Sequence, residues 1–161
     1  MTKSIKINNF IYFLPSIIVM IVIFFMSNDP VSGEKSSRLI ELLYKLINYF
    51  INYDFNEYYQ NLGSFIIRKI AHISEYMILT LTYYLAISKN NFKNYTFRQI
   101  YFYSGLFAVL YSISDEYHQT FVKGRVGTYE DVLIDSIGVF LGYFIIKLYN
   151  KMFYNKFLQK N

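Results

Sequence analysis

Ionisable side chains gather in three short stretches of this sequence, each bordering an apolar segment. The first, "RKIAHISEY", carries Arg68, His72 and Glu75 at spacings of four and three, so a helix places them on one face. Lys69, His72 and Tyr76 form the neighbouring stripe. A histidine beside a carboxylate is typical of general acid–base chemistry, in which positioned side chains move protons to and from a reacting group.

The second stretch, "YSISDEYHQ", ends an apolar segment. On a helix, one side of this stretch carries Tyr111, Asp115, His118 and Gln119. Glu116 adds a second carboxylate beside Asp115.

The third stretch, "EDVLIDSIGVFLG", begins another apolar segment and spaces its polar and small residues by four, three and four: Asp131, Asp135, Gly138 and Gly142. The two glycines form a small-x-x-x-small step, which lets helix backbones approach closely, and we assign them to packing.

Between the second and third stretches, "KGRVG" predicts a tight turn in which Gly124 and Gly127 bracket Arg125. Such a turn can present backbone N–H groups to an anion. A connection between two helices also needs glycine for conformation alone, and we favour that interpretation.

Four apolar segments must position these groups, and they predict a membrane protein. Apolar residues make up 54% of the 161-residue chain and charged residues only 17%, against about 25% in soluble domains. A helix needs about 20 apolar residues to cross a bilayer core, and the candidate spans are 8–27, 66–88, 100–119 and 132–149. A cleaved signal peptide is the alternative for the first, but "FFMSNDP" lacks the A-x-A cleavage pattern.

Residues 36–52 predict an amphipathic helix on the membrane surface. Its apolar residues recur at helical spacing: Leu39, Leu42, Leu43, Leu46, Ile47 and Phe50. Arg38, Glu41 and Lys45 oppose insertion of this short helix across the bilayer. The predicted fold is therefore one all-α domain, 1–161: a polytopic bundle of four transmembrane helices with an interfacial helix in the first external loop.

Basic residues predict the orientation, because short cytoplasmic loops of membrane proteins are rich in Lys and Arg. With both ends of the chain inside, segments 1–9, 89–99 and 147–161 carry nine bases and no acid. All 11 acids then fall on the outer half with the other seven bases, so the inside carries +9 and the outside −4, which sums to the net charge of +5. Both termini are expected to be cytoplasmic.

This topology brings the ionisable groups of three helices to one depth near the outer surface. A charge at mid-bilayer costs roughly 3 kcal/mol, so such groups usually face a protein interior and have partners. One explanation is structural pairing within the cluster: Arg68 or Lys69 with Glu75, and Arg125 with Asp131 or Asp135. The carboxylates outnumber the nearby bases, however, and carboxylates in excess repel one another unless they protonate, bind a cation or meet a polar ligand.

A metal site stays open on the sequence alone. His72 and His118 are the chain's two histidines, and with the carboxylates they could hold zinc or a harder divalent cation. Their spacing matches no metal-binding motif, so the metal and any cofactor are left unknown. The chain has no cysteine, which excludes thiolate ligands and disulfides.

Together these stretches resemble the VanZ-like family of membrane proteins from about Ile11 to Ile146. Three linked motifs carry the resemblance: K-x-x-H-x-x-E-Y opening the second span, D-E-x-x-Q closing the third, and G-R-x-G followed by D-x-x-x-D-x-x-G on the fourth. Lys123 departs from the family pattern, which often has proline before the Gly-Arg pair. The family's polar positions fall on residues already singled out: Lys69, His72, Glu75, Tyr76, Asp115, Glu116, Gln119, Arg125, Asp131 and Asp135.

The resemblance implies a role at the outer face of a bacterial cytoplasmic membrane, because the family is named after a protein that confers resistance to the lipoglycopeptide teicoplanin, with little effect on vancomycin. The first hypothesis is a cell-envelope resistance factor that binds a polar or phosphate-bearing head group. Arg68, Lys69 and Arg125 would contact the anion, and Tyr76 and Gln119 would donate hydrogen bonds. The expected partners are membrane lipids, a lipid-linked cell-wall precursor or the lipoglycopeptide; no nucleic acid is expected, and the oligomeric state is open.

The second hypothesis is an intramembrane enzyme, such as a metal-assisted hydrolase or transferase, that acts on a lipid or a lipid-linked envelope precursor. Glu75 or Asp115 would be the general acid or base, and His72 would orient or shuttle the proton. Asp131 and Asp135 would bind a divalent cation or hold the arginine of the predicted turn. An enzyme needs its carboxylates even against isosteric amides, whereas a binding role tolerates the amides in part.

Overall fold

All regular secondary structure in the computed structural model, which describes residues 9–51, 57–90 and 95–158, is helical. A 3-10 helix and five α-helices follow one another: η1 (Asn9–Phe13), α1 (Leu14–Ser27), α2 (Ser32–Ile51), α3 (Glu57–Lys89), α4 (Phe97–Gln119) and α5 (Tyr129–Leu158). No strand occurs in these ranges. The all-α prediction is confirmed.

Three helical stretches in the described part of the chain are long and apolar enough to cross a membrane: Phe10–Ser27, Glu57–Lys89 and Tyr129–Met152. They overlap the first, second and fourth predicted spans. α4, the third predicted span, is 23 residues long but is not among them. The helices support a membrane protein, while the number of four spans stays a prediction.

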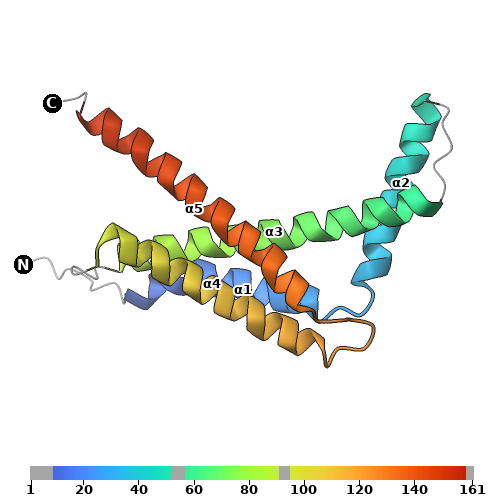
Figure 1. The fold of residues 1–161 in the computed structure, drawn as a ribbon, viewed down its shortest axis with the longest axis horizontal. Helices are drawn as coiled ribbons and strands as arrows, with labels where there is room; N and C mark the ends of the chain where they lie inside the picture. The colour runs from blue at the N-terminus through green and yellow to red at the C-terminus, as the bar shows by residue number, and fades with distance from the viewer. Residues whose placement is uncertain (1–8, 52–56, 91–94, 159–161) are drawn as a thin grey trace, which may run out of the picture.

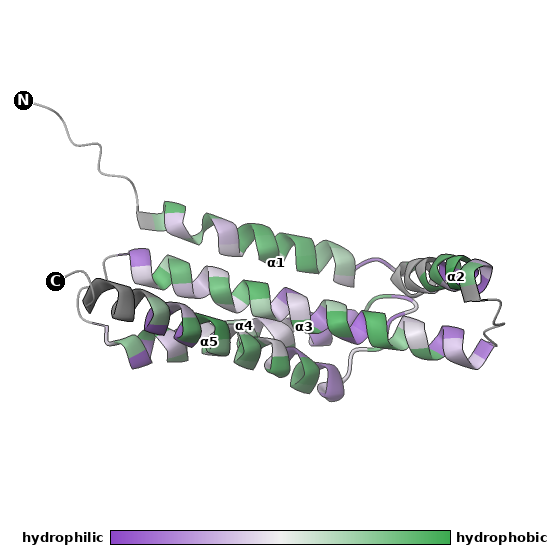
Figure 2. Cartoon of the chain, turned by 90° about the horizontal axis from the view of Figure 1, so that it is seen from above, coloured by the Kyte–Doolittle hydropathy of each residue, from purple (hydrophilic) through white to green (hydrophobic). Residues whose placement is uncertain are grey.

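α1 is apolar along most of its length, as Figure 2 shows, and most of its large side chains are exposed. Pro15 lies in its first turn, where the missing N–H costs no intrahelical hydrogen bond. An exposed face of this kind suits contact with lipid.

α3 is the central helix of the bundle and packs against α1, α2, α4 and α5. α1 and α4 run in one direction, and α3 and α5 return in the other (Figure 1). α2 stands across one end of the bundle (Figure 1). This α2 end is where α1 and α4 finish and α5 begins.

α5 crosses α3 at the two glycines of the small-x-x-x-small step (Figure 1). A Cβ on Gly138 would lie 2.2 Å from the backbone oxygen of Ile73, and one on Gly142 would lie 3.1 Å from the Cβ of Thr80. Glycine is therefore required at the first position for the observed approach of the backbones, which confirms the assignment to packing.

The buried core joins α1, α3, α4 and α5, with Tyr76, Leu79 and Ala108 fully buried. Tyrosine hydroxyls tie the helices to one another around this core. The Tyr111 hydroxyl donates to the backbone oxygen of Met20 at 2.7 Å, across from α4 to α1.

Two helices are longer than the predicted spans. α3 begins at Glu57, where hydropathy predicts a start at residue 66, and α5 continues to Leu158 beyond the predicted end at residue 149. Backbone hydrogen bonds continue a helix through polar turns that hydropathy excludes from a span. The added turns of α3 pack against α2, where the Tyr44 hydroxyl donates to the backbone oxygen of Tyr59 at 2.7 Å.

Candidate functional site

Polar side chains of α3, α4 and α5 form a cluster of hydrogen bonds and ion pairs at the α2 end, which we call the network. Nδ1 of His72 lies 3.1 Å from Oδ1 of Asp135, and the Ser112 hydroxyl donates to Oδ2 of Asp135 at 2.6 Å. Asp135 is fully buried. Because a carboxylate only accepts, Nδ1 of His72 carries the proton and Nε2 is left without a partner among the described residues.

Lys69 adds an ion pair to this network. Its ammonium contacts Asp131, in the first turn of α5, and both side chains are largely buried. The backbone N–H of Asp131 donates to the hydroxyl of Thr128 at 3.2 Å, which satisfies a donor at the start of α5. The ion pair therefore holds the beginning of α5 against α3.

The end of α4 supplies the third part of the network. Nε2 of Gln119 donates to Oδ2 of Asp115 at 3.1 Å and to Oε1 of Glu116 at 3.0 Å. The backbone N–H of Thr128 donates to Oε2 of Glu116 at 3.0 Å. A Cβ on Gly127 would lie 1.9 Å from the backbone oxygen of Glu116, so glycine lets the turn approach α4 this closely.

The turn between α4 and α5 is also tied to α1. Nη2 of Arg125 donates to the backbone oxygen of Met26 at 2.6 Å, in the last turn of α1, where helix carbonyls have no intrahelical partner. Gly124 has a φ of +81°, a conformation that favours glycine. The conformational interpretation is confirmed for Gly124, whereas Gly127 is required by its close approach to α4.

The ion pairing differs from the pairing expected from the sequence. Lys69 pairs with Asp131 instead of Glu75, and Arg125 binds a backbone carbonyl instead of Asp131 or Asp135. The crossing of α5 over α3 is the physical reason, because it places the first turn of α5 beside Lys69.

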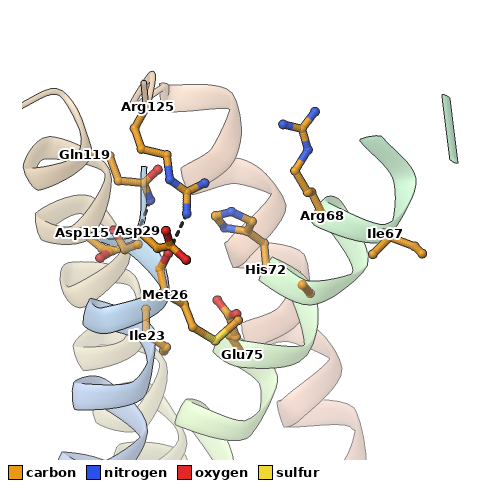
Figure 3. Close-up of a pocket in the computed structure, with 12 residues that line it drawn as sticks. Ile23, Met26, Asp29, Ile67, Arg68, His72, Glu75, Asp115, Gln119 and Arg125 are labelled. Carbon is orange, nitrogen blue, oxygen red and sulfur yellow. Dashed lines mark hydrogen bonds between the residues drawn. The ribbon is translucent and has the colours of Figure 1, made fainter. Parts of the chain in front are cut away.

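A cavity of about 330 Å³ lies beside this network, between α3 and the C-terminal ends of α1 and α4 (Figure 3). Its polar lining consists of Ser27, Asp29, Arg68, His72, Glu75, Asp115, Gln119 and Arg125. Its apolar lining consists of Ile23, Met26, Ile67 and Ala71. Figure 3 places Arg68 and Arg125 toward one end of the cavity and Glu75 toward the other.

Several charged groups of the cavity have unused hydrogen-bonding capacity. Glu75 and Arg68 make no hydrogen bond or ion pair with a described residue. Oδ1 of Asp115 and Nε of Arg125 are buried without a hydrogen-bond partner in the part of the chain that the structure describes. Arg68 is exposed and Glu75 is only partly buried, so solvent can reach both side chains. The buried atoms of Asp115 and Arg125 are the stronger sign of a ligand, because buried polar groups are usually satisfied.

The remaining candidate residues lie outside the cavity lining. Tyr76 is fully buried in the core, and its hydroxyl has no hydrogen-bond partner among the described residues. His118 stacks on Phe24 of α1, with ring centroids 4.9 Å apart. Neither lines the cavity, so a contact of the Tyr76 hydroxyl with a ligand there has no support.

Three residues could offer ligands to a divalent cation. One atom each from His72, Glu116 and Asp135 lies within 4.8 Å of the other two. The carboxylate oxygens already accept hydrogen bonds from protein donors, including Ser112 and the Thr128 N–H. A cation would share these oxygens with the protein donors, because a carboxylate oxygen can accept a hydrogen bond and bind a cation at once. Asp131 belongs to the Lys69 ion pair instead.

Two contributions were missed by sequence reasoning. Ser112 precedes Asp115 by three residues and Gln119 by seven, so helical spacing alone could have placed it on the same face. The end of α1, with Ser27 and Asp29, forms one wall of the cavity. In the sequence, the one feature that marks Ser27 and Asp29 is their position at the end of the first apolar segment.

The all-helical fold, the membrane-length apolar helices and the ionisable cluster at one end define an α-helical membrane protein. A family model described as VanZ/LLP1 matches residues 11–150, and the chain belongs to this family. The resemblance of the three motifs is confirmed, and membership supports a VanZ-type, resistance-related membrane protein. No curated protein and no solved structure matches the chain significantly.

Proposed function

We propose that this protein crosses a bacterial cytoplasmic membrane four times, with both ends inside and α2 on the outer surface. The alternating directions of α1, α3, α4 and α5 support an even number of crossings (Figure 1). The acids of the described residues lie toward the α2 end, whereas Lys89, Arg98 and Lys147 belong to segments at the other end, as a positive inside requires. Leu42, Leu46 and Phe50 of α2 are exposed, which suits a helix lying on lipid.

At the outer face, the protein acts as a VanZ-type resistance factor that binds a polar head group. The observation that carries this proposal is the cavity of about 330 Å³, whose Glu75, Arg68 and Asp115 have polar groups without internal partners. The volume lies at the small end of ligand cavities, which span about 300–1,000 Å³. A head group fits this space, whereas a whole lipoglycopeptide is several times larger. Resistance would then follow from a bound envelope component, not from a sequestered antibiotic.

The test is teicoplanin and vancomycin susceptibility in a sensitive Gram-positive host, with wild type, Glu75→Gln, Asp115→Asn and empty vector at matched membrane abundance. We expect wild type to raise resistance to teicoplanin alone, and both amides to reduce it. Glu57→Gln is the matched control, because it makes the same change on an exposed first turn of the same helix. A wild type without protection would refute the resistance role.

A second candidate is an intramembrane enzyme, and the geometry of His72 favours it. The buried Asp135 holds Nδ1 of His72, as a carboxylate orients the base in many acid–base pairs, and the ring lines the cavity beside Glu75. Nε2 would then exchange a proton with a bound lipid or lipid-linked precursor. Mass spectrometry of envelope lipids tests this candidate: an enzyme accumulates a product that disappears with His72→Gln, whereas a binding factor leaves the lipid composition unchanged.

A further inference from the structure

We infer that the cavity recognises a zwitterionic head group made of a phosphate ester and a primary ammonium, the chemistry of phosphoethanolamine. This inference names the ligand class of the site in the proposed function and rests on that function's assignment of the cavity to ligand binding. It follows from the position of the charges, their unused hydrogen-bonding capacity and the composition of the cavity walls.

The phosphate is bound by the two guanidinium groups. Arg68 has no ion-pair partner among the described residues, and Nε of Arg125 is buried without a hydrogen-bond partner there. Guanidinium groups present several N–H donors in a planar fork that matches phosphate oxygens. Both arginines line the cavity and lie toward the same end of it (Figure 3), and we assign the phosphate to that end.

The ammonium is bound by the carboxylates deeper in the cavity. Glu75 makes no ion pair or hydrogen bond with a described residue, and Oδ1 of Asp115 is buried without a hydrogen-bond partner among them, although Oδ2 accepts from Gln119. Asp115 is only 4% exposed, so an unused oxygen on its side chain is costly. The nearby Ser27 hydroxyl and a ligand in the cavity are the two groups that can donate to it. An ammonium group supplies three N–H donors to such acceptors.

The residues that line the cavity argue against two other ligand classes, a purely anionic group and a quaternary ammonium. Three carboxylates, Asp29, Glu75 and Asp115, accompany two arginines in the lining, so a ligand with only negative charge meets repulsion. A quaternary ammonium prefers the faces of Trp, Tyr or Phe. Although Phe, Tyr and Trp make up 21% of the chain, none of them is among the described residues that line the cavity. The site therefore suits a primary ammonium, which can donate hydrogen bonds.

The test compares two lipids that differ only in methylation of the nitrogen. The full-length protein is equilibrated in micelles with equal amounts of phosphatidylethanolamine and phosphatidylcholine, and native mass spectrometry measures which lipid stays bound. We expect a preference for phosphatidylethanolamine of at least about tenfold, because charge-assisted hydrogen bonds are lost on methylation. Glu75→Gln or Asp115→Asn lowers this ratio toward one, whereas Arg68→Gln weakens both lipids equally.

Matched controls keep the test decisive. Glu57→Gln on α3 and Arg98→Gln on α4 change the same residue types on exposed positions outside the cavity and should keep the wild-type ratio. Equal retention of the two lipids by wild type overturns the inference without any variant, and so does stronger retention of phosphatidylglycerol, which would identify an anion site. A preference that survives both amides also overturns it.

Soluble phosphoethanolamine distinguishes the source of the head group. If soluble phosphoethanolamine displaces the lipid, the protein recognises the head group alone. If it does not displace the lipid while the lipid preference holds, the ligand is the intact lipid. Both results support the inference.

Failure of the proposed function gives a different result. A protein that prefers phosphatidylethanolamine but gives no teicoplanin protection has the head-group site without the resistance role. Protection without the preference assigns the cavity to another ligand.

Discussion

Two neighbouring regions of this bundle use the same residue types in opposite ways. Between α3, α4 and α5, each carboxylate oxygen of Asp135 and Glu116 has a partner within the protein. In the adjoining cavity, Glu75 has none among the described residues and Asp115 uses only one oxygen. Three residues belong to both regions, since they make network bonds and also line the cavity: His72, Asp115 and Gln119.

We interpret this difference as a division between polar groups that hold the fold and polar groups available to a ligand. A satisfied buried network holds helices in one arrangement, and losing a member leaves other buried groups unpaired. Unsatisfied charges destabilise the fold and persist where function requires them. Variants of the network should therefore lower stability, whereas variants of Glu75 and Arg68, which line the cavity outside the network, should lower function alone. The predictions below test this division.

The largest effect is expected at the crossing that brings the network together. Gly138→Ala should lower the free energy of unfolding by about 3 kcal/mol, because the new Cβ meets the backbone oxygen of Ile73, which cannot move without separating α5 from α3. Gly142→Ala should cost about 1 kcal/mol, because its Cβ meets the side chain of Thr80 at a wider 3.1 Å. Circular dichroism follows unfolding in micelles, since the chain has no Trp for fluorescence. Equal effects of the two changes would contradict this ranking.

Removing the central acceptor should have the next largest effect. Asp135→Ala should lower stability by about 2 kcal/mol, because it leaves the N–H of His72 and the hydroxyl of Ser112 buried without an acceptor. Asp135→Asn retains one acceptor oxygen and should recover part of the loss. The same unfolding measurement compares both variants with wild type. If Asp135→Ala is as stable as wild type, the network does not stabilise the fold.

The ion pair between α3 and α5 should show a smaller coupling. A double-mutant cycle of Lys69→Met and Asp131→Asn should give an interaction of about 1 kcal/mol, because both side chains are largely buried.

The control is the exposed ion pair of Glu41 and Lys45 on α2, in which Nζ of Lys45 lies 2.7 Å from Oε1 of Glu41. The hydrogen bond from Lys45 lowers the pKa of Glu41, so any stabilisation is lost as the pH falls through that pKa. We expect no measurable coupling for this solvated pair at neutral pH. Equal coupling in both pairs would remove the distinction between buried and exposed ion pairs.

The smallest effect on stability is expected in the cavity. Glu75→Gln should leave the unfolding midpoint unchanged or slightly raised, because it removes a charge that has no ion-pair partner among the described residues. The same variant should lose teicoplanin protection and lipid selectivity. A clear loss of stability would instead place Glu75 in the structural network.

Local features of the sequence determined the helices, the segregation of charge and the packing role of two glycines. Hydropathy and helical spacing are properties of neighbouring residues, so they predicted α1, α3, α5 and the face shared by Arg68, His72 and Glu75. They also predicted the amphipathic character of α2. Hydropathy underestimated α3 and α5, because helices extend through turns that are not apolar.

Only the tertiary structure decided which of these groups meet. Helical spacing identifies a face but not the height at which a neighbouring helix crosses it, and one turn is a displacement of about 5.4 Å. The crossing at Gly138 therefore selected Asp131 as the partner of Lys69 and Asp135 as the partner of His72. It left Glu75 facing a cavity instead of a base, a difference that no local pattern in the sequence contains.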